Sequence, residues 1–193
     1  LSPWKKITHL VLNTKNKVNI AIIGKYVELK DAYKSLDEAL THGGIANNLK
    51  VNLIRIESDF LKPSEIKNKL KGASGILIPG GFGKRGTEGK IAAINYARLN
   101  KIPFLGICFG MQMAVIEFAR NKLNIKKATS SEFGPSKASV VGLMSEWTKD
   151  GKLMKGTDKD LGGTMRLGSY EARLKKDTKI SKIYKSSKIY ERH

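Results

Sequence analysis

The most reactive side chain in the sequence is Cys108, which is also its only cysteine. Glycines stand two residues before it and two residues after it, in the run Gly106-Ile-Cys-Phe-Gly110. A nucleophile on a sharp turn between a strand and a helix needs glycine at both places, because side chains there would collide. On such a turn the sulfur lies at the helix N-terminus, where free N–H groups favour a thiolate and can hold an oxyanion. The pattern predicts a nucleophilic thiol, and a buried cysteine that only packs is the alternative.

A second glycine-rich turn, Ile78-Pro-Gly-Gly-Phe-Gly83, follows an apolar run. We expect it at the carboxyl edge of a parallel sheet beside the strand that carries Cys108, since open α/β sheets bind ligands at that edge. Its backbone N–H groups could face an oxyanion, and its glycines let a substrate approach the chain closely. An ordinary tight turn is the alternative. A phosphate loop is disfavoured because no Gly-Lys-Ser/Thr ending is present.

Strand and helix patterns alternate through the first half of the chain, which predicts an open, mostly parallel sheet covered by helices. Short apolar runs predict strands at residues 18–23, 51–56, 75–79 and 102–107. Helical spacing and Pro63 predict helices at residues 32–46, 63–70, 87–99 and 111–119. Beyond about Lys122 the segments become shorter and richer in Gly, Ser and Thr, which predicts a β-rich second half with a hairpin or bulged strand pair at residues 161–168.

Length and composition limit the class of protein. A chain of 193 residues fits one sizeable domain, which we expect to begin at Val18, with Leu1 to Lys17 as a linker or N-terminal extension. No apolar stretch reaches the roughly 18–20 residues of a membrane span, and no signal peptide is visible, so we expect a soluble, cytoplasmic protein. One cysteine allows no internal disulfide, and the three scattered histidines suggest no metal cluster with it; these are His9, His42 and His193.

The formal net charge of +19 raises the question of nucleic-acid binding. The lysines are spread over every segment, and no aromatic residues alternate with a basic cluster as a stacking platform requires. We therefore expect no specific nucleic-acid partner, and interpret the charge as a lysine-rich bias of solvated faces.

Together these motifs resemble the class I glutamine amidotransferases, whose glutaminase domain has a flavodoxin-like open α/β fold and a Cys-His-Glu triad. The resemblance rests on Pro79-Gly-Gly-Phe-Gly83 followed by Leu105-Gly-Ile-Cys-Phe-Gly-Met-Gln112. Further stretches are similar, more narrowly, to the glutaminase domain of the CTP synthase family. They are Gly24 to Ser35, Pro79 to Gly89, Ser131-Glu-Phe133 and Leu161 to Gly168.

The resemblance implies release of ammonia from L-glutamine, which a separate synthetase domain would use to aminate ATP-activated UTP to CTP. It implies Cys108 as the nucleophile, with Gly81 and the backbone after the elbow holding the oxyanion. The implied glutamine-binding residues are Gly81, Phe109, Gly110, Met111, Gln112 and Glu132, the last for the substrate's ammonium group. For Glu132 a solvated loop carboxylate is the alternative.

The resemblance implies no cofactor in this domain, with ATP, Mg²⁺ and the activator GTP serving a full-length enzyme that is expected to be a homo-oligomer. Arg85 to Gly89 lie where the family senses GTP, and a solvated loop is the competing interpretation.

One part of the family pattern is missing from the sequence. The family places its triad base and orienting carboxylate in a His-x-Glu segment, and none of the three histidines is followed by x-Glu. The last residues, Tyr190 to His193, look like the start of the segment that precedes it, including an Arg that contacts glutamine. We therefore expect an amidotransferase domain that is incomplete at its C-terminal end, with weak or absent glutaminase activity by itself.

Two other functions remain open from the residues. A small hydrolase with a cysteine elbow often has His after the nucleophile, and Phe109 counts against it. A non-catalytic binding or regulatory module that docks a synthetase partner or a polyanion is the second. An electrophilic glutamine analogue would modify Cys108 in a competent glutaminase domain and leave a mere scaffold unlabelled.

Overall fold

The structure is a computed structural model that describes residues 1–143, 146–149, 152–155 and 167–192. Its contacts form two compact units, Leu1–Gly142 and Leu143–His193, and each is described by itself. The expected boundary of one domain at Val18 stays a prediction. No helix in the described ranges is long and apolar enough to cross a membrane.

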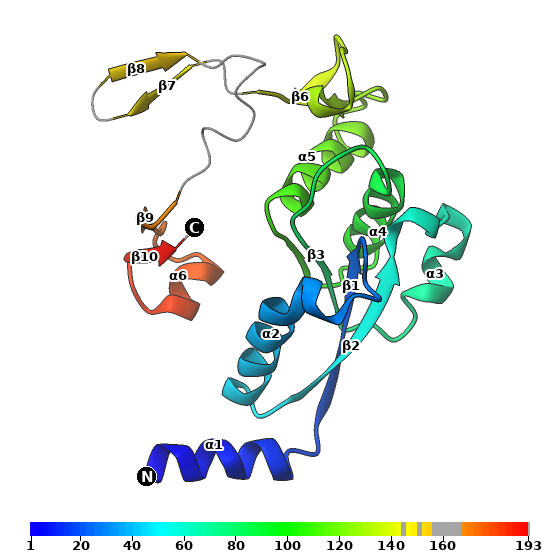
Figure 1. Cartoon of the computed structure of the whole chain (residues 1–193). Helices are drawn as coiled ribbons and strands as arrows, with labels where there is room; N and C mark the ends of the chain where they lie inside the picture. Colours follow the sequence, from blue (N-terminus) through cyan, green and yellow to red (C-terminus); the bar gives the residue numbers. More distant parts are fainter. Residues whose placement is uncertain (144–145, 150–151, 156–166, 193) are drawn as a thin grey trace. The chain divides into compact units, whose positions relative to one another are not determined.

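Four parallel strands form the central sheet of the first unit, in the order β2-β1-β3-β4 (Figure 1). Their bounds are β1 Lys17–Gly24, β2 Lys50–Glu57, β3 Gly75–Ile78 and β4 Phe104–Gly106. The mostly parallel sheet that the sequence predicts is thus confirmed. The strand expected at 102–107 is shorter at both ends, because Ile102 bonds back to the preceding helix at Ala97 and Ile107 already belongs to the turn.

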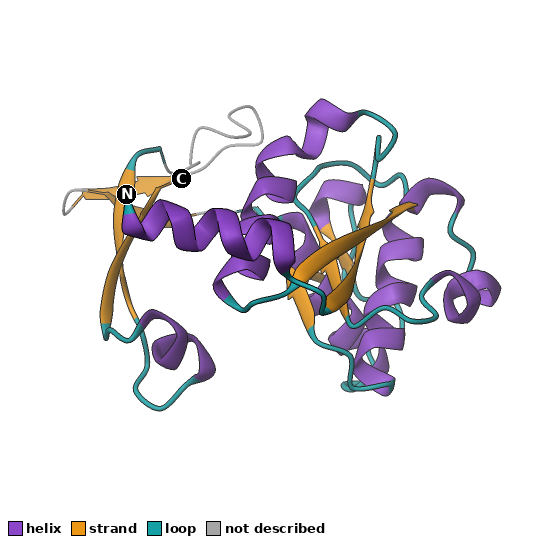
Figure 2. Cartoon of the chain, turned by 90° about the horizontal axis from the view of Figure 1, so that it is seen from below, coloured by secondary structure: helices purple, strands orange, loops and turns teal. Residues whose placement is uncertain are grey.

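Helices cover both faces of this sheet (Figure 2). Helix α2, Lys34–Ala46, packs on β2, whereas α4, Thr87–Leu99, packs on β1, β3 and β4 and against α5, Phe109–Asn121. The chain moves from β1 to β2 in one direction and from β3 to β4 in the other. Right-handed crossovers in opposite directions place their helices on opposite faces. Between β2 and β3 lie three short helical elements, namely η2 Ser58–Phe60, η3 Pro63–Glu65 and α3 Ile66–Lys69. The helix expected at 63–70 thus begins as a 3₁₀ turn and ends one residue early.

The hydrophobic core lies between the sheet and the α4–α5 pair. Ile78 and Met113 are fully enclosed there, and Phe109, the first residue of α5, is 1% exposed. A buried carboxylate ties the two helices together: Glu117 accepts hydrogen bonds from Arg98 at 2.8 Å and from Asn95 at 2.8 Å. Although burial opposes its charge, these bonds hold the pKa of Glu117 below its usual value. The elbow helix is therefore fixed along its length.

Three further local predictions need correction. Residues 1–17, which show no clear pattern, contain helix α1, Ser2–Asn13, whose start signal is Pro3 in the first turn. The helix expected at 32–46 begins as a 3₁₀ turn, η1 Lys30–Tyr33, before α2. The helix expected at 111–119 begins two residues earlier, because Cys108 is itself its N-cap, and it continues to Asn121.

After α5 most of the regular elements among the described residues are short strands, in agreement with the prediction of a β-rich second half. The first unit ends with β5 Thr129–Ser130, η4 Ser131–Phe133 and β6 Ser139–Val141, where β5 and β6 pair in parallel. The second unit contains the antiparallel pairs β7 Glu146–Lys149 with β8 Lys152–Lys155 and β9 Ser169–Arg173 with β10 Lys188–Arg192, with α6 Lys179–Tyr184 preceding β10. The hairpin expected at 161–168 lies largely outside the described residues, and its last two positions are not in a strand.

Candidate active site

Cys108 occupies a strained turn between β4 and α5. Its backbone has φ 50° and ψ −103°, a conformation that costs an L-residue free energy unless the surroundings impose it. The turn is closed by hydrogen bonds on both sides, from the Ile107 N–H to the Ile78 carbonyl at 2.9 Å and from the Gly110 N–H to the Ile107 carbonyl at 2.9 Å. The residue is exposed and its thiol is free. The geometry is that of a nucleophile elbow.

The two glycines around the turn are required by close backbone contacts. A Cβ on Gly106 would lie 2.6 Å from the Gly110 carbonyl carbon and the Met111 nitrogen, and one on Gly110 would overlap the Ile78 carbonyl oxygen. Neither neighbour can move without breaking the elbow, since both are backbone. The spacing that the sequence shows thus has the expected physical cause.

The Gly-Gly turn lies beside the thiol, as predicted. Strands β3 and β4 pair in parallel, with Ile78 opposite Gly106, so the turn that follows β3 meets the turn that follows β4. A Cβ on Gly80 would lie 3.7 Å from the Cys108 Cβ. Open space faces Gly81, where an added Cβ would meet no atom within 4 Å.

Two backbone donors are available near the sulfur. Within the described part of the chain, no acceptor takes the N–H of Gly81 or the N–H of Phe109. Donors on two adjacent turns, free of partners and next to a nucleophile, can stabilise an oxyanion that develops on an attacked carbonyl.

Glu132 is brought to the same loop. It lies in η4, and its Oε1 accepts a hydrogen bond from the Gly83 N–H at 2.5 Å. The Phe133 ring beside it packs edge-on against the Phe109 ring, with centroids 6.1 Å apart, and so anchors η4 to the elbow helix. The side chain is exposed, and among the described residues its Oε2 has no partner. That oxygen could accept a bond from a cationic group.

The other predicted glutamine-binding residues lie on the first turn of α5. Met111 is 56% exposed and Gln112 is half-buried, so both can contact a ligand. The Phe109 side chain is enclosed, so only its backbone is available, and Gly110 is needed for packing against β3. Their assignment to glutamine stays a prediction.

Two charged side chains lie close to the site, Lys90 beside the start of the elbow helix and Arg85 just after the Gly-Gly turn. Lys90 of α4 is 2% exposed, and its ammonium lies 5.1 Å from the centroid of the Phe109 ring. Burial and the nearby charge of Lys25 lower the pKa of Lys90 to about 8, against the opposing effect of Asp59. Arg85 pairs with Asp59 at 2.7 Å and lies over the Tyr26 ring at 5.2 Å, so it is not simply solvated.

These features can be compared with known proteins. The profile of the family "Glutamine amidotransferase class-I" matches residues 28–193 of this chain. The chain belongs to the class I glutamine amidotransferases. The predicted family and its fold are confirmed.

Similarity to individual members is also high. The chain is 75% identical over 193 residues to a protein named CTP synthase from Pelagibacter ubique (strain HTCC1062), and 58% identical over 194 residues to one from Rhizobium johnstonii. Each match includes 100% of this chain and 36% of the relative, so the chain spans about a third of the length of these proteins. A solved structure named the Trypanosoma brucei CTPS glutaminase domain with bound acivicin superposes with a TM-score of 0.76 and 36% identity, covering 91% of this chain and 66% of that one. These similarities do not favour a non-catalytic module or another small hydrolase.

Sequence reasoning about this amidotransferase missed two side chains of the site. Lys25 follows β1, and its Nζ donates a hydrogen bond to the Phe82 carbonyl at 2.7 Å. Lys90 appears in the sequence as one lysine among many, and only its burial against Phe109 distinguishes it. The apolar period of α4 was the one sequence signal that could have indicated this burial, because Lys90 precedes Ile91 at the buried start of the helix.

Proposed function

We propose that this chain is the glutamine-hydrolysing part of a CTP synthase. The observation that carries the proposal is the strained elbow at Cys108, placed beside a Gly-Gly turn with free N–H donors on both turns. The similarity to CTP synthases over the whole chain supports the choice among amidotransferases.

The proposed chemistry begins at the side-chain amide of L-glutamine. The Cys108 thiolate attacks the amide carbon, a C–S bond forms, and the oxygen becomes an oxyanion held by the Gly81 and Phe109 N–H groups. The C–N bond then breaks and ammonia departs with a proton from a general acid. Water hydrolyses the thioester to glutamate and restores the thiol. Met111, Gln112 and Glu132 would bind the substrate, with Glu132 Oε2 on its ammonium group.

We propose that the general base and acid come from a His-x-Glu segment, which these 193 residues do not contain. For the chain by itself we expect glutamine turnover reduced by about 10⁴-fold relative to a complete triad. The nucleophile and the oxyanion donors are present, so a reagent that carries its own leaving group should still react.

The test is covalent labelling with a chloroketone derived from L-glutamine, read by intact mass. The sulfur displaces chloride, one C–S bond forms, and we expect one adduct on each chain. Cys108→Ala should give no adduct. The D-enantiomer is the matched control reagent. It should react at least about tenfold more slowly, since it cannot place its ammonium group at Glu132 and its carbonyl at the thiol at the same time.

Equal rates for the two enantiomers would contradict a glutamine site, and so would labelling of the Cys108→Ala variant. Rapid glutamine turnover by this chain alone, lost in Cys108→Ala, would contradict the proposed source of the base.

For the whole protein, we propose a cytoplasmic homo-oligomer in which a synthetase domain uses the ammonia to convert UTP to CTP with ATP and Mg²⁺. GTP as an activator belongs to the same proposal, as does the absence of a cofactor in this domain. The ion pair of Arg85 with Asp59 and its position over Tyr26 make this loop an ordered surface on which an activator could act.

A further inference from the structure

One peptide unit of the Gly-Gly turn is held from both sides by charged groups. The Phe82 carbonyl and the Gly83 N–H belong to the same planar peptide. The Lys25 ammonium donates to that carbonyl at 2.7 Å, and the Glu132 carboxylate accepts from that N–H at 2.5 Å. A cation on the oxygen and an anion on the nitrogen polarise the peptide in the same direction, and charge-assisted bonds are the stronger ones.

We propose that Lys25 is a positioning residue for the oxyanion donor of this loop, acting with Glu132 as a clamp on the Phe82–Gly83 peptide. The inference rests on the proposed function for its role in catalysis. The Gly81 N–H faces the reacting carbonyl because the Phe82–Gly83 peptide, two peptide bonds further along the chain, cannot rotate.

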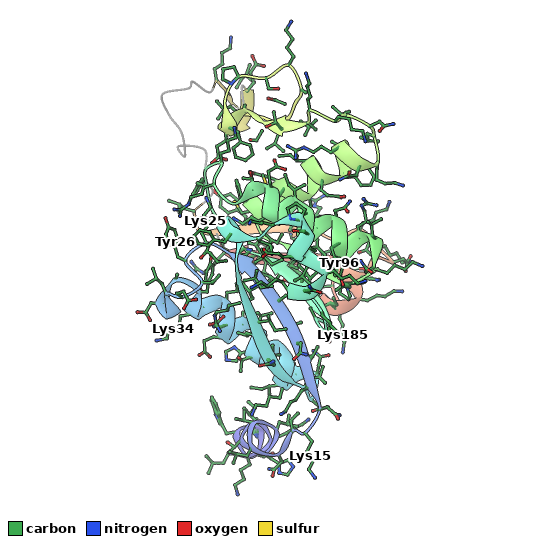
Figure 3. All side chains as sticks on the ribbon, turned by 90° about the vertical axis from the view of Figure 1, so that its right-hand side faces the viewer. Lys15, Lys25, Tyr26, Lys34, Tyr96 and Lys185 are labelled. Atoms are coloured by element: carbon green, nitrogen blue, oxygen red, sulfur yellow. The ribbon has the colours of Figure 1, made fainter. Side chains whose placement is uncertain are left out.

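Lys25 is itself held in place. The Tyr33 hydroxyl donates to the Lys25 carbonyl at 2.6 Å and accepts from the Lys25 N–H at 3.1 Å. Burial raises the pKa of Tyr33, so the hydroxyl stays protonated and keeps its donor. A Cβ on the preceding Gly24 would collide with the Tyr33 ring, which explains the glycine at that position. Figure 3 shows Lys25 where β1 ends, the edge at which the Gly-Gly turn also lies.

The clamp also assigns the two oxygens of Glu132. Oε1 is occupied by Gly83, and Oε2 is the oxygen available for a ligand. The carboxylate would thus order the loop and bind the substrate at once. Removing Lys25 tests the loop without touching the group that binds substrate.

The loop and the chemistry can be measured separately in Lys25→Met. Amide exchange of Gly83, followed by NMR on the ¹⁵N-labelled chain, reports the clamp, and we expect it to accelerate about fivefold to tenfold. Labelling of Cys108 by the L-glutamine chloroketone reports the oxyanion donors, and we expect its rate to fall about tenfold. Alkylation by iodoacetamide needs no oxyanion donor, and it should change less than about twofold.

The matched control is Lys84→Met, which removes the same charge from an exposed neighbour of the loop. It should leave all three measurements within about twofold. Lys25→Arg, which keeps a cationic donor, should restore most of the chloroketone rate. Lys25→Gln, whose side chain is too short to reach Phe82, should behave as Lys25→Met and provides a second test if the Met variant folds poorly.

A Gly83 exchange rate and a chloroketone rate in Lys25→Met equal to those of Lys84→Met would overturn the proposal. An equal fall in the chloroketone and iodoacetamide rates would also overturn it, because Lys25 would then act on the thiol or on folding. If the wild type does not distinguish the chloroketone enantiomers, the proposed function fails, and the Gly83 exchange rate still decides whether the clamp exists.

Discussion

Burial of the Lys90 ammonium lowers the stability of the folded protein. Its ammonium is almost fully buried against the Phe109 ring, where the cation–π contact returns part of the free energy lost by desolvation. The folded-state pKa of about 8 lies below the value of roughly 10.4 that an unfolded chain has. Below pH 8 the protein therefore keeps a charge where a neutral group would be more stable.

We predict that Lys90→Met is more stable than the wild type at pH 7, by on the order of 1–3 kcal/mol. Between about pH 8 and pH 10.4 the unfolded state binds more protons than the folded state, so the stability of the wild type rises with pH in this window. The gap between the two proteins should shrink accordingly. Urea unfolding of both proteins at pH 7 and pH 9.5 measures this difference, in which other titrations cancel.

Lys84→Met is the control for this prediction, since Lys84 is exposed, and its effect should stay within about 0.5 kcal/mol at both pH values. A Lys90→Met protein that is less stable at pH 7, or a gap that does not change with pH, would show that the charge is not the source of the cost.

At the scale of elements, the elbow depends on the close approach of α5 to β3. Strand β3 is fully buried, and the first turn of α5 lies against the Ile78 carbonyl with no room for a side chain on Gly110. The contact fixes the helix N-terminus at the end of the sheet, and with it the position of the thiol and the Phe109 N–H. The packing of two elements, rather than any one residue, sets the geometry of the nucleophile.

We predict that Gly110→Ala destabilises the protein by roughly 3 kcal/mol or more, because the added methyl group overlaps backbone that cannot move. Gly43→Ala is the matched control: Gly43 lies in α2, and its Cβ would meet no atom within 4 Å. There the same change should stabilise by up to about 1 kcal/mol through helix propensity. Thermal and urea unfolding of both variants provide the measurement, and a Gly110→Ala protein of wild-type stability would mean that α5 is placed differently.

At the scale of the whole molecule, the net charge of +19 is the dominant feature. Thirty-six basic residues stand against 17 acidic ones, and the ion pairs within the described part of the chain are few and mostly exposed. Repulsion among the lysines should therefore oppose the compact state at low ionic strength. Mobile salt ions weaken this repulsion over distances longer than the Debye length.

We predict that the melting temperature rises by several degrees when NaCl is raised from about 10 mM to about 300 mM, as screening reduces self-repulsion. A series in sodium sulfate at matched ionic strength separates screening from the added stabilisation by excluded salts. A melting temperature that stays constant, or falls with NaCl, would mean that attractive pairs outweigh the repulsion.

Local patterns in the sequence determined much of this protein. The apolar runs specified four strands of a parallel sheet, and the two glycines around Cys108 specified an elbow, because both depend on a residue's immediate neighbours. The start of α4 was predicted at the observed residue, and the helix at α1 was missed because its apolar residues face solvent rather than a core.

Only the tertiary structure decided which polar groups meet at the site. Lys25 lies 57 residues from Phe82, and Gly83 lies 49 residues from Glu132, yet these pairs hold one peptide between them. The burial of Lys90 is of the same kind: the sequence shows it as one of 36 basic residues, and the apolar period of α4 gives only a weak sign that this one is buried. Hydrophobic period fixes an element and its inner face, whereas contacts between loops follow from the strand order and the path of each turn, which no local pattern encodes.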